Sequence, residues 1–148
     1  MTTRVAVALG ADPLHLGHLL HIREARKLGD YLIAITGPDE FLVKKKGYCL
    51  LPLEDRMELL KSLREVDGVV VAVDKDGTVA ETLRKIKPDI FCKGGDRTAN
   101  TMPENEIKAC EEIGCEIIYG VGKQLNSSSL LVQNACLRIM GLGGWVDD

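Results

Sequence analysis

The chain has 148 residues with a net charge of −3, 45% hydrophobic and 28% charged residues, and only 4% aromatic residues. This balance is typical of one compact globular domain, here residues 1–148 with a tail from residue 141, and it disfavours nucleic acid as a partner. No apolar run approaches the roughly 18 residues that span a membrane, so we expect no membrane contact and a cytoplasmic location.

The N-terminal segment alternates between predicted strands and a predicted helix. Residues 4–9 (RVAVAL) form an apolar run that predicts a buried strand. After the loop GADPLHL, residues 17–28 place apolar side chains on one side at helical spacing, and Gly29 and Asp30 end this helix. Residues 31–36 (YLIAIT) predict a second strand.

A polar, lysine-bearing connection over residues 37–51 comes next, and its length is typical of a functional loop. Pro52 opens a helix whose apolar residues recur with a period of about 3.6 residues. Residues 69–73 (VVVAV), which are β-branched or Ala, predict a third strand. Residues 78–86 predict a short helix that ends before Pro88.

The C-terminal part continues the alternation. Residues 89–93 (DIFCK) predict a fourth strand, and residues 103–113 predict a helix with Pro at its start and Gly after its end. Residues 115–119 (CEIIY) predict a fifth strand. Residues 127–140 predict a last helix, preceded by Asn126 and begun by a serine run, both suited to N-capping.

Short apolar strands separated by helices predict a parallel sheet that is covered on both faces. Right-handed crossovers then give an α/β, Rossmann-like, doubly wound fold with a five-stranded parallel sheet. In such sheets ligands bind outside the carboxyl ends of the strands, near the switch in strand order. We therefore expect the functional residues in the loops that follow the strands.

The three histidines, His15, His18 and His21, fall close together where the first strand gives way to the first helix. Gly17, between the first two, lets the backbone approach a ligand closely. Imidazole N–H donors beside a helix N-terminus would bind phosphate oxygens and stabilise charge on a phosphorus atom under attack. Two alternatives stay open: purely structural histidines, or a metal site made by the three histidines with Asp12.

The segment GADPLHLGH, followed by LGDYLIAIT, resembles the start of the HxGH nucleotidyltransferase superfamily. The later segments DEFLVKKK, PLEDRMELLKSLREVDGVVV and IKPDIFCKGGD resemble its cytidylyltransferase-like branch. That branch includes glycerol-3-phosphate cytidylyltransferase and the adenylyltransferase domain that makes ADP-heptose. The similarity extends over residues 4–135, and the order HxGH, ExR, KGGD is its most specific feature.

The resemblance implies roles for the matching residues. His15 and His18 would contact the triphosphate and stabilise the pentacovalent phosphorus, and Lys45, with Lys46, would neutralise phosphates from a mobile loop. Arg56 matches an arginine near the acceptor or the site wall; its alternative is an exposed residue at a helix start. The residues expected to bind the nucleotide are Gly10, Ala11, Asp12, Gly17, Gly94, Gly95, Asp96, Ser127 and Ser128.

The chain departs from the family pattern at two places. Ala11 stands where the family carries an aromatic residue, which would leave room near the nucleotide or the acceptor. Residues 122–126 (GKQLN) replace the arginine that cytidylyltransferases carry ahead of the last helix. The second departure weakens the argument for CTP as the donor.

The expected function is transfer of CMP from CTP to a small phosphorylated acceptor such as glycerol 3-phosphate, with release of pyrophosphate. The alternative is an adenylyltransferase that uses ATP on a sugar phosphate similar to heptose 1-phosphate, or on a cofactor precursor such as FMN. A non-catalytic nucleotide-binding domain is the alternative of a different class. No residue is predicted to bind a metal directly, Mg²⁺ is expected to arrive with the triphosphate, and the resemblance implies a homodimer.

Overall fold

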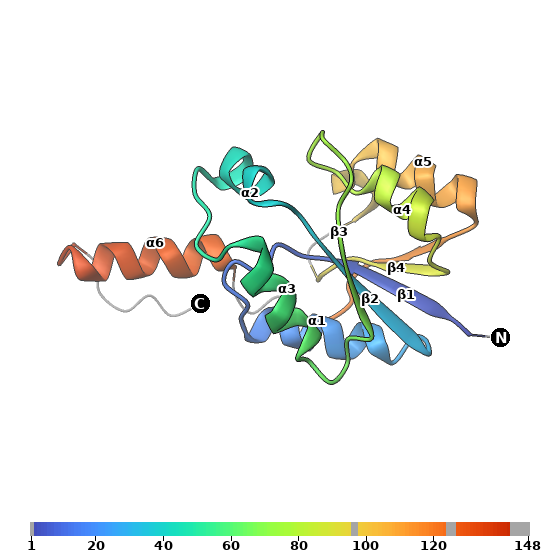
Figure 1. Ribbon diagram of the computed structural model, residues 1–148, viewed down its shortest axis with the longest axis horizontal. Coiled ribbons are helices and arrows are strands. Elements are labelled where there is room, and N and C mark those ends of the chain that lie inside the picture. The colour runs from blue at the N-terminus through green and yellow to red at the C-terminus, as the bar shows by residue number, and fades with distance from the viewer. Residues whose placement is uncertain (1, 96–97, 124–126, 143–148) are drawn as a thin grey trace.

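The computed structural model describes residues 2–95, 98–123 and 127–142, and its centre is a parallel sheet with helices on both faces (Figure 1). The strands are β1 Arg4–Ala8, β2 Tyr31–Thr36, β3 Gly68–Val71, β4 Ile90–Cys92 and β5 Glu116–Ile118. The helices are α1 Leu16–Arg26, α2 Asp39–Lys46, α3 Leu53–Lys61, α4 Ala80–Ile86, α5 Glu104–Ile113 and α6 Ser128–Ile139, with a short 3₁₀ helix at Ala99–Thr101.

The sheet has five parallel strands in the order β3-β2-β1-β4-β5, which confirms the predicted Rossmann-like architecture. The chain begins in the middle at β1, builds outward to β3, and then returns to add β4 on the other side of β1. Val5 pairs with Ile90 and Val7 with Cys92 across that junction. Because the strand order reverses there, the carboxyl ends of β1 and β4 flank the crevice where such sheets bind ligands.

Alternate residues of β1 face opposite sides of the sheet and enter two separate cores. Val5 and Val7 pack with Ile22 of α1 and Leu60 of α3. Ala6 packs on the other side, in the cluster that α4 and α5 cover. Figure 1 shows α1 and α3 on one face and α4 and α5 on the other. Burial on both faces explains why the strands have continuous apolar sequences.

The connection over residues 37–51, predicted as a loop, contains helix α2. Asp39 and Glu40 lie in its first turn and the lysine run Lys44–Lys46 lies in its last turn, so both sets of charges complement the helix dipole. Gly47 ends the helix with φ of 89°, the left-handed conformation that favours glycine. The prediction was wrong because a lysine run in a last helical turn has the same composition as a solvated loop.

Helix α6 projects away from the sheet (Figure 1), and none of its described residues is buried. Its first turn lies at the carboxyl edge of the sheet, and the hydroxyl of Ser127 accepts a hydrogen bond from the backbone N–H of Leu130 at 3.1 Å, as the predicted N-cap requires. Asn126 and the greater part of the predicted tail lie outside the described residues. None of the helices in the described ranges is long and apolar enough to cross a membrane.

Candidate active site

A cavity of about 360 Å³ lies at the carboxyl ends of β1 and β4. Its walls come from the loops after β1, β4 and β5, from the first turns of α1 and α6, and from the end of α2. The predicted site residues that border it are Gly10, Ala11, Asp12, His15, Gly17, His18, Lys45, Lys46, Gly94, Gly95, Ser127 and Ser128. The tertiary structure thus brings together residues from both ends of the chain. Asp96 lies outside the described residues.

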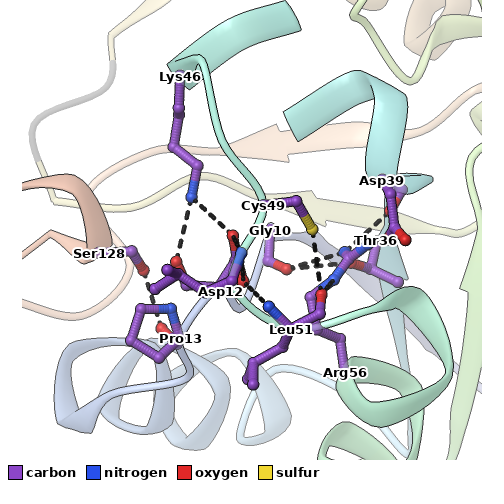
Figure 2. A network of polar contacts seen from close by, with 12 residues as sticks. Gly10, Asp12, Pro13, Thr36, Asp39, Lys46, Cys49, Leu51, Arg56 and Ser128 are labelled. Atoms are coloured by element: carbon purple, nitrogen blue, oxygen red, sulfur yellow. Dashed lines mark hydrogen bonds and ion pairs between the residues drawn. The ribbon is translucent and has the colours of Figure 1, made fainter. Parts of the chain in front are cut away.

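Asp12 organises the loop that follows β1 (Figure 2). Its carboxylate is fully buried and accepts hydrogen bonds from the backbone N–H groups of Leu50 and Leu51, the shortest at 2.7 Å. Lys46 lies 3.3 Å from the same carboxylate. Burial alone would raise the pKa of Asp12, but these hydrogen bonds and the lysine outweigh it and lower the pKa. The carboxylate oxygens hold the segment after α2 in place, and a role of Asp12 in nucleotide binding stays a prediction.

Ala11, beside Asp12, has the left-handed φ of 54° and is 1% exposed. It belongs to the core cluster under α1 and α3 while it also borders the cavity. The small side chain of Ala11 therefore packs in the core. The room that the sequence suggested near the nucleotide or the acceptor is not simply the space of a missing aromatic ring.

His15 and His18 stack their rings, with centroids 3.8 Å apart and an interplanar angle of 25°. The backbone N–H of His15, the N-cap of α1, donates to Nδ1 of His18 at 3.2 Å. Burial, followed by the nearby His15, His21 and Lys46, lowers the pKa of His18 to about 3. A neutral ring whose Nδ1 accepts a hydrogen bond must carry its proton on Nε2. His18 therefore offers the cavity a neutral N–H donor at physiological pH.

His15 contributes a second group to the same wall. Its side chain faces the backbone N–H of His18 in a capping box, but its buried Nδ1 has no full hydrogen bond within the described ranges. Burial also lowers the pKa of His15, so the ring is held in its neutral form. A buried polar atom without a partner is rare in folded proteins and is often explained by a ligand or by solvent. The histidine pair, beside the free N–H groups of the α1 N-terminus, suits a phosphate chain.

The depressed pKa of His18 predicts acid sensitivity. Unfolded chains take up a proton on His18 below its ordinary pKa of 6.5, whereas the folded protein does so only near pH 3. The unfolded state therefore binds more protons in this window, and His18 by itself lowers the free energy of unfolding by up to about 1.4 kcal/mol per pH unit on acidification below pH 6.5, in addition to the effects of His15 and His21. Urea unfolding of wild type and His18→Asn between about pH 7 and pH 4.5 measures this.

In that comparison, His18→Asn should lose less stability than wild type over the same interval. Asp12 does not interfere, because its pKa is lowered below the ordinary 3.8 and its contribution is lost only at more acidic pH. Identical pH profiles for the two proteins would contradict the buried, neutral state of His18.

His21 has a different role from the other two histidines. Its Nδ1–H donates to the carbonyl oxygen of Val121 at 2.6 Å and so ties α1 to the loop after β5. No group of three or more His, Cys, Asp or Glu side chains in the described ranges has the geometry to hold a metal ion. The alternative of a three-histidine metal site with Asp12 therefore has no structural support.

Gly122, one residue further on, lies directly against α1. A Cβ atom added there would lie 2.8 Å from Cα of His21, whereas a Cβ at Gly120 would meet no described atom within 4 Å. Both glycines have positive φ, 82° and 68°. Gly120→Ala should thus cost about 1 kcal/mol in backbone strain alone, and Gly122→Ala should cost about 2–4 kcal/mol because the loop must also move. Urea unfolding of the two variants measures the difference.

The same pair of variants tests whether this loop shapes the cavity. Gly122 and Lys123 border the cavity, so Gly122→Ala should also weaken nucleotide binding, measured by titration calorimetry, while Gly120→Ala should not. Equal stability and equal affinity in the two variants would show that the close approach to α1 is not needed.

The cavity is basic although the whole chain is acidic. Among the described residues, four lysines and one aspartate border it: Lys45, Lys46, Lys93, Lys123 and Asp12. Lys45 is exposed at the end of α2, while Lys46 is held by the Asp12 carboxylate and its backbone oxygen. The predicted phosphate contact through Lys46 is thus limited, because that ammonium already serves a buried anion.

Lys93 and Lys123 were not singled out from the sequence. Lys93 directly precedes Gly94 at the carboxyl end of β4, and its ammonium lies 3.8 Å from Oε1 of Glu106 and 4.8 Å from the ring centre of Phe91. Its place at the end of a buried strand, at the head of KGGD, was the available signal. Lys123 is the one basic residue between β5 and α6, and only the fold shows that this loop reaches the cavity.

Arg56 is buried behind Gly10, a residue of the cavity wall, and does not itself border the cavity. Its guanidinium is fully buried and donates to the carbonyl oxygens of Gly10, Gly37 and Leu51 and to the hydroxyl of Thr36 (Figure 2). It also forms an ion pair with Asp39 at 2.7 Å. Neither an acceptor contact nor an exposed helix start fits this environment. Arg56 instead joins the ends of β1 and β2 to the start of α2.

The serines at the start of α6 complete the far wall. The hydroxyl of Ser128 donates to the carbonyl oxygen of Pro13 at 2.9 Å (Figure 2), which links α6 to the loop after β1. Ser127 caps the helix through Leu130. Two helices, α1 and α6, therefore present their N-terminal turns to one cavity, and each N-terminus favours anionic groups.

A smaller cavity of about 170 Å³ adjoins the first one. The two share Ala8, Leu9, Gly10, Leu42, Lys45 and Lys93. A further hollow of about 610 Å³ lies beyond it and shares Phe41, Lys45 and Gly77 with the small cavity. The shared residues make these spaces one groove that runs past the end of α2.

Comparison with known proteins agrees with this geometry. Residues 11–130 match the model of the family described as cytidylyltransferase-like. The chain belongs to the cytidylyltransferase-like family. Relatives of this chain include enzymes such as the FAD synthases, so the cavity of this cytidylyltransferase-like protein is a candidate enzyme site.

Two curated relatives illustrate the family. The FAD synthase of Pyrococcus abyssi strain GE5 is 40% identical over 98 residues, 64% of this chain and 65% of the relative. The bifunctional protein HldE of Hahella chejuensis is 34% identical over 122 residues, 81% of this chain but 23% of the relative. The cytidylyltransferase-like protein thus spans somewhat under two thirds of the first relative and about a quarter of the second.

A solved structure shows the same fold. The lipopolysaccharide core biosynthesis protein of Thermoplasma volcanium superposes with a TM-score of 0.69 and 26% identity, covering 82% of this chain and 98% of that one. The doubly wound sheet of this cytidylyltransferase-like protein is therefore the fold of its relatives.

Proposed function

We propose that this nucleotidyltransferase is an adenylyltransferase that transfers AMP from ATP to the phosphate of a small acceptor, with FMN as the first candidate. The observation that carries nucleotidyl transfer is the pair of neutral imidazoles, His15 and His18, between two helix N-termini in one lysine-rich cavity. Those donors suit the triphosphate and the charge that develops on its α-phosphorus.

In the proposed reaction an oxygen of the acceptor phosphate attacks the α-phosphorus in line, the new O–P bond forms, and the bond to the β-phosphate oxygen breaks. Pyrophosphate leaves with that bonding pair. The acceptor phosphate is already ionised near neutral pH, so no general base is needed. The protein acts by positioning and by charge stabilisation, as in other transfers at phosphorus. The Nε2–H of His18 would donate to a non-bridging oxygen of the α-phosphate.

The names of the relatives favour ATP over CTP. FAD is AMP joined to FMN, so an FAD synthase uses ATP, and relatives with that name match this chain at 40% identity. The expectation of CTP with glycerol 3-phosphate has weaker support, in keeping with the missing arginine ahead of α6. A sugar 1-phosphate is the second candidate acceptor, favoured by the match to the protein HldE.

The groove offers room for an acceptor larger than glycerol phosphate. The small cavity leads into the hollow of about 610 Å³, whose border includes Pro38 and Phe41. A flat ring system could lie against Pro38 and Phe41, between the charged residues that make up most of the rest of this border, while the phosphate lies at the first cavity. This arrangement supports FMN ahead of a compact sugar phosphate.

Mg²⁺ enters this proposal as part of the MgATP substrate. The Asp12 carboxylate, the one acidic group among the described residues that border the cavity, is fully engaged by backbone N–H groups and Lys46. The protein side chains therefore do not fit a dedicated metal cage, and we assign no step to one. We also propose that the protein forms a homodimer, as the family resemblance implies.

The experiment is pyrophosphate release with each donor and acceptor pair, namely ATP with FMN, ATP with a sugar 1-phosphate, and CTP with glycerol 3-phosphate. Thermal stabilisation by each nucleotide with Mg²⁺ runs in parallel, since a ligand at about 100 times its Kd adds roughly 2.7 kcal/mol. We expect ATP to stabilise most and FMN to give pyrophosphate. Turnover with CTP alone would overturn the adenylyltransferase proposal.

A further inference from the structure

Glu106, in the first turn of α5, borders the small cavity and was not identified from the sequence. The residue is only 4% exposed. One carboxylate oxygen, Oε2, accepts a hydrogen bond from the backbone N–H of Val79 at 3.1 Å. The other, Oε1, is buried without a hydrogen-bond partner among the described residues, and Lys93 at 3.8 Å is outside hydrogen-bond distance.

A structural role accounts for only one of the two oxygens. The bond from Val79 to Oε2 fastens the segment before α4 to α5. A buried carboxylate oxygen without a hydrogen bond is costly, and the Lys93 ammonium at 3.8 Å from Oε1 replaces only part of the hydration that burial removes. Glu106 borders the small cavity, so a ligand in that cavity could supply the missing hydrogen bond to this buried oxygen.

The charges along the groove indicate which part of the acceptor lies there. Lys45 and Lys93 border both the first and the small cavity, so an acceptor phosphate is favoured at their junction. The Glu106 carboxylate would repel that phosphate, so the group next to it must be uncharged and must carry a donor. About 170 Å³ equals roughly six water volumes, which suits a short hydroxylated carbon segment.

We propose that Glu106 is a specificity-determining residue, whose Oε1 accepts a hydrogen bond from a hydroxyl group on the carbon segment next to the acceptor phosphate. This inference rests on the proposed transfer to a phosphorylated acceptor. It selects polyol or sugar phosphates over phosphates on plain alkyl chains. FMN, with its hydroxylated chain, and sugar 1-phosphates share this chemistry.

The test is Glu106→Gln with Glu111→Gln as the matched control. Glu111 is an exposed residue of the same helix and borders none of the cavities. In Glu106→Gln the amide oxygen can still accept the hydrogen bond from the N–H of Val79, and an NH₂ group takes the place of Oε1. We expect Glu106→Gln to raise the KM for the acceptor by about tenfold or more, with the KM for ATP unchanged, and Glu111→Gln to change neither.

A second comparison changes the substrate. Wild type should use a flavin phosphate with a plain alkyl chain about tenfold less well than FMN, and Glu106→Gln should discriminate much less between the two. The same comparison is made with a sugar 1-phosphate and its deoxy analogues. The set of acceptors for which wild type discriminates and Glu106→Gln does not identifies the acceptor class. If Glu106 had a purely structural role, the effect of Glu106→Gln would not depend on whether the acceptor carries the hydroxyl groups.

Three results would overturn the inference. If wild type is active and Glu106→Gln matches Glu111→Gln, the inference fails and the proposed function stands. If Glu106→Gln raises both KM values together, or if wild type does not distinguish the deoxygenated acceptors, Glu106 is a structural residue. If wild type releases no pyrophosphate with any acceptor, the proposed function fails and takes the inference with it.

Discussion

Replacement of His18 by Ala is expected to lower the rate of pyrophosphate release by about 10²–10³-fold, the usual cost of removing one preorganised donor to a developing charge. The reason is specific to this ring. Its Nδ1 is occupied by the backbone N–H of His15, and burial keeps it neutral, so Nε2–H is its one donor for substrate. The loss should fall on kcat more than on the KM for ATP, because the charge appears only in the transition state.

Two further variants separate the donor from the fold. In His18→Asn the amide oxygen can replace Nδ1 and keep the bond from His15, but the donor at the Nε2 position is lost, so this variant should be as inactive as His18→Ala. His18→Gln places an N–H near the Nε2 position and should retain part of the activity. Stability of all variants is followed by thermal unfolding with and without MgATP. Full activity in His18→Asn would remove His18 from the mechanism.

Replacement of Arg56 by Met is expected to lower the free energy of unfolding by about 3–5 kcal/mol. The guanidinium is the shared donor for Gly10, Thr36, Gly37 and Leu51. Its removal leaves the carbonyl oxygen of Gly37 without this donor, while Gly10 and Leu51 keep only the weaker donors Thr36 and Cys49. The ion pair with Asp39 adds less, because that carboxylate is 47% exposed. Urea unfolding measures the change.

Arg64→Met is the matched control, because Arg64 is exposed just beyond α3 and should change stability by no more than about 0.5 kcal/mol. The family resemblance placed Arg56 near the acceptor, and the same variant decides between the two roles. If Arg56→Met were as stable as Arg64→Met yet showed a raised KM for the acceptor, the contact predicted by resemblance would be right and the structural role wrong.

The secondary structure could be predicted from the sequence to within a few residues because it depends on local patterns. Apolar runs such as RVAVAL and YLIAIT become strands wherever both faces are buried, and the periodic segments become helices. The elements missed were the short 3₁₀ helix at Ala99–Thr101 and α2, whose ends are marked by charge and by Gly47 and whose apolar content is low.

The candidate site was predicted in part. His15, His18 and the glycines after β4 carry a local signal, since glycine-bearing turns after strands are where such folds bind phosphate. Lys45 was implied only by the family resemblance, and the structure places all of these residues around one cavity. Glu106 carries no such signal, because an acidic residue in a first helical turn is ordinary in any sequence. Only its burial and its unpaired oxygen distinguish it.

The sequence by itself indicated most of the element types, the parallel, doubly wound class of the sheet, and the phosphate character of the first turn, since each depends on residues close together. The tertiary structure decided which polar residues serve the fold and which face the ligand. Asp12 and Arg56 bind segments that lie dozens of positions away, as His21 does with Val121, and no local pattern shows that their hydrogen-bonding capacity is already used. Burial creates that distinction, because it demands a partner for every polar group that it removes from water.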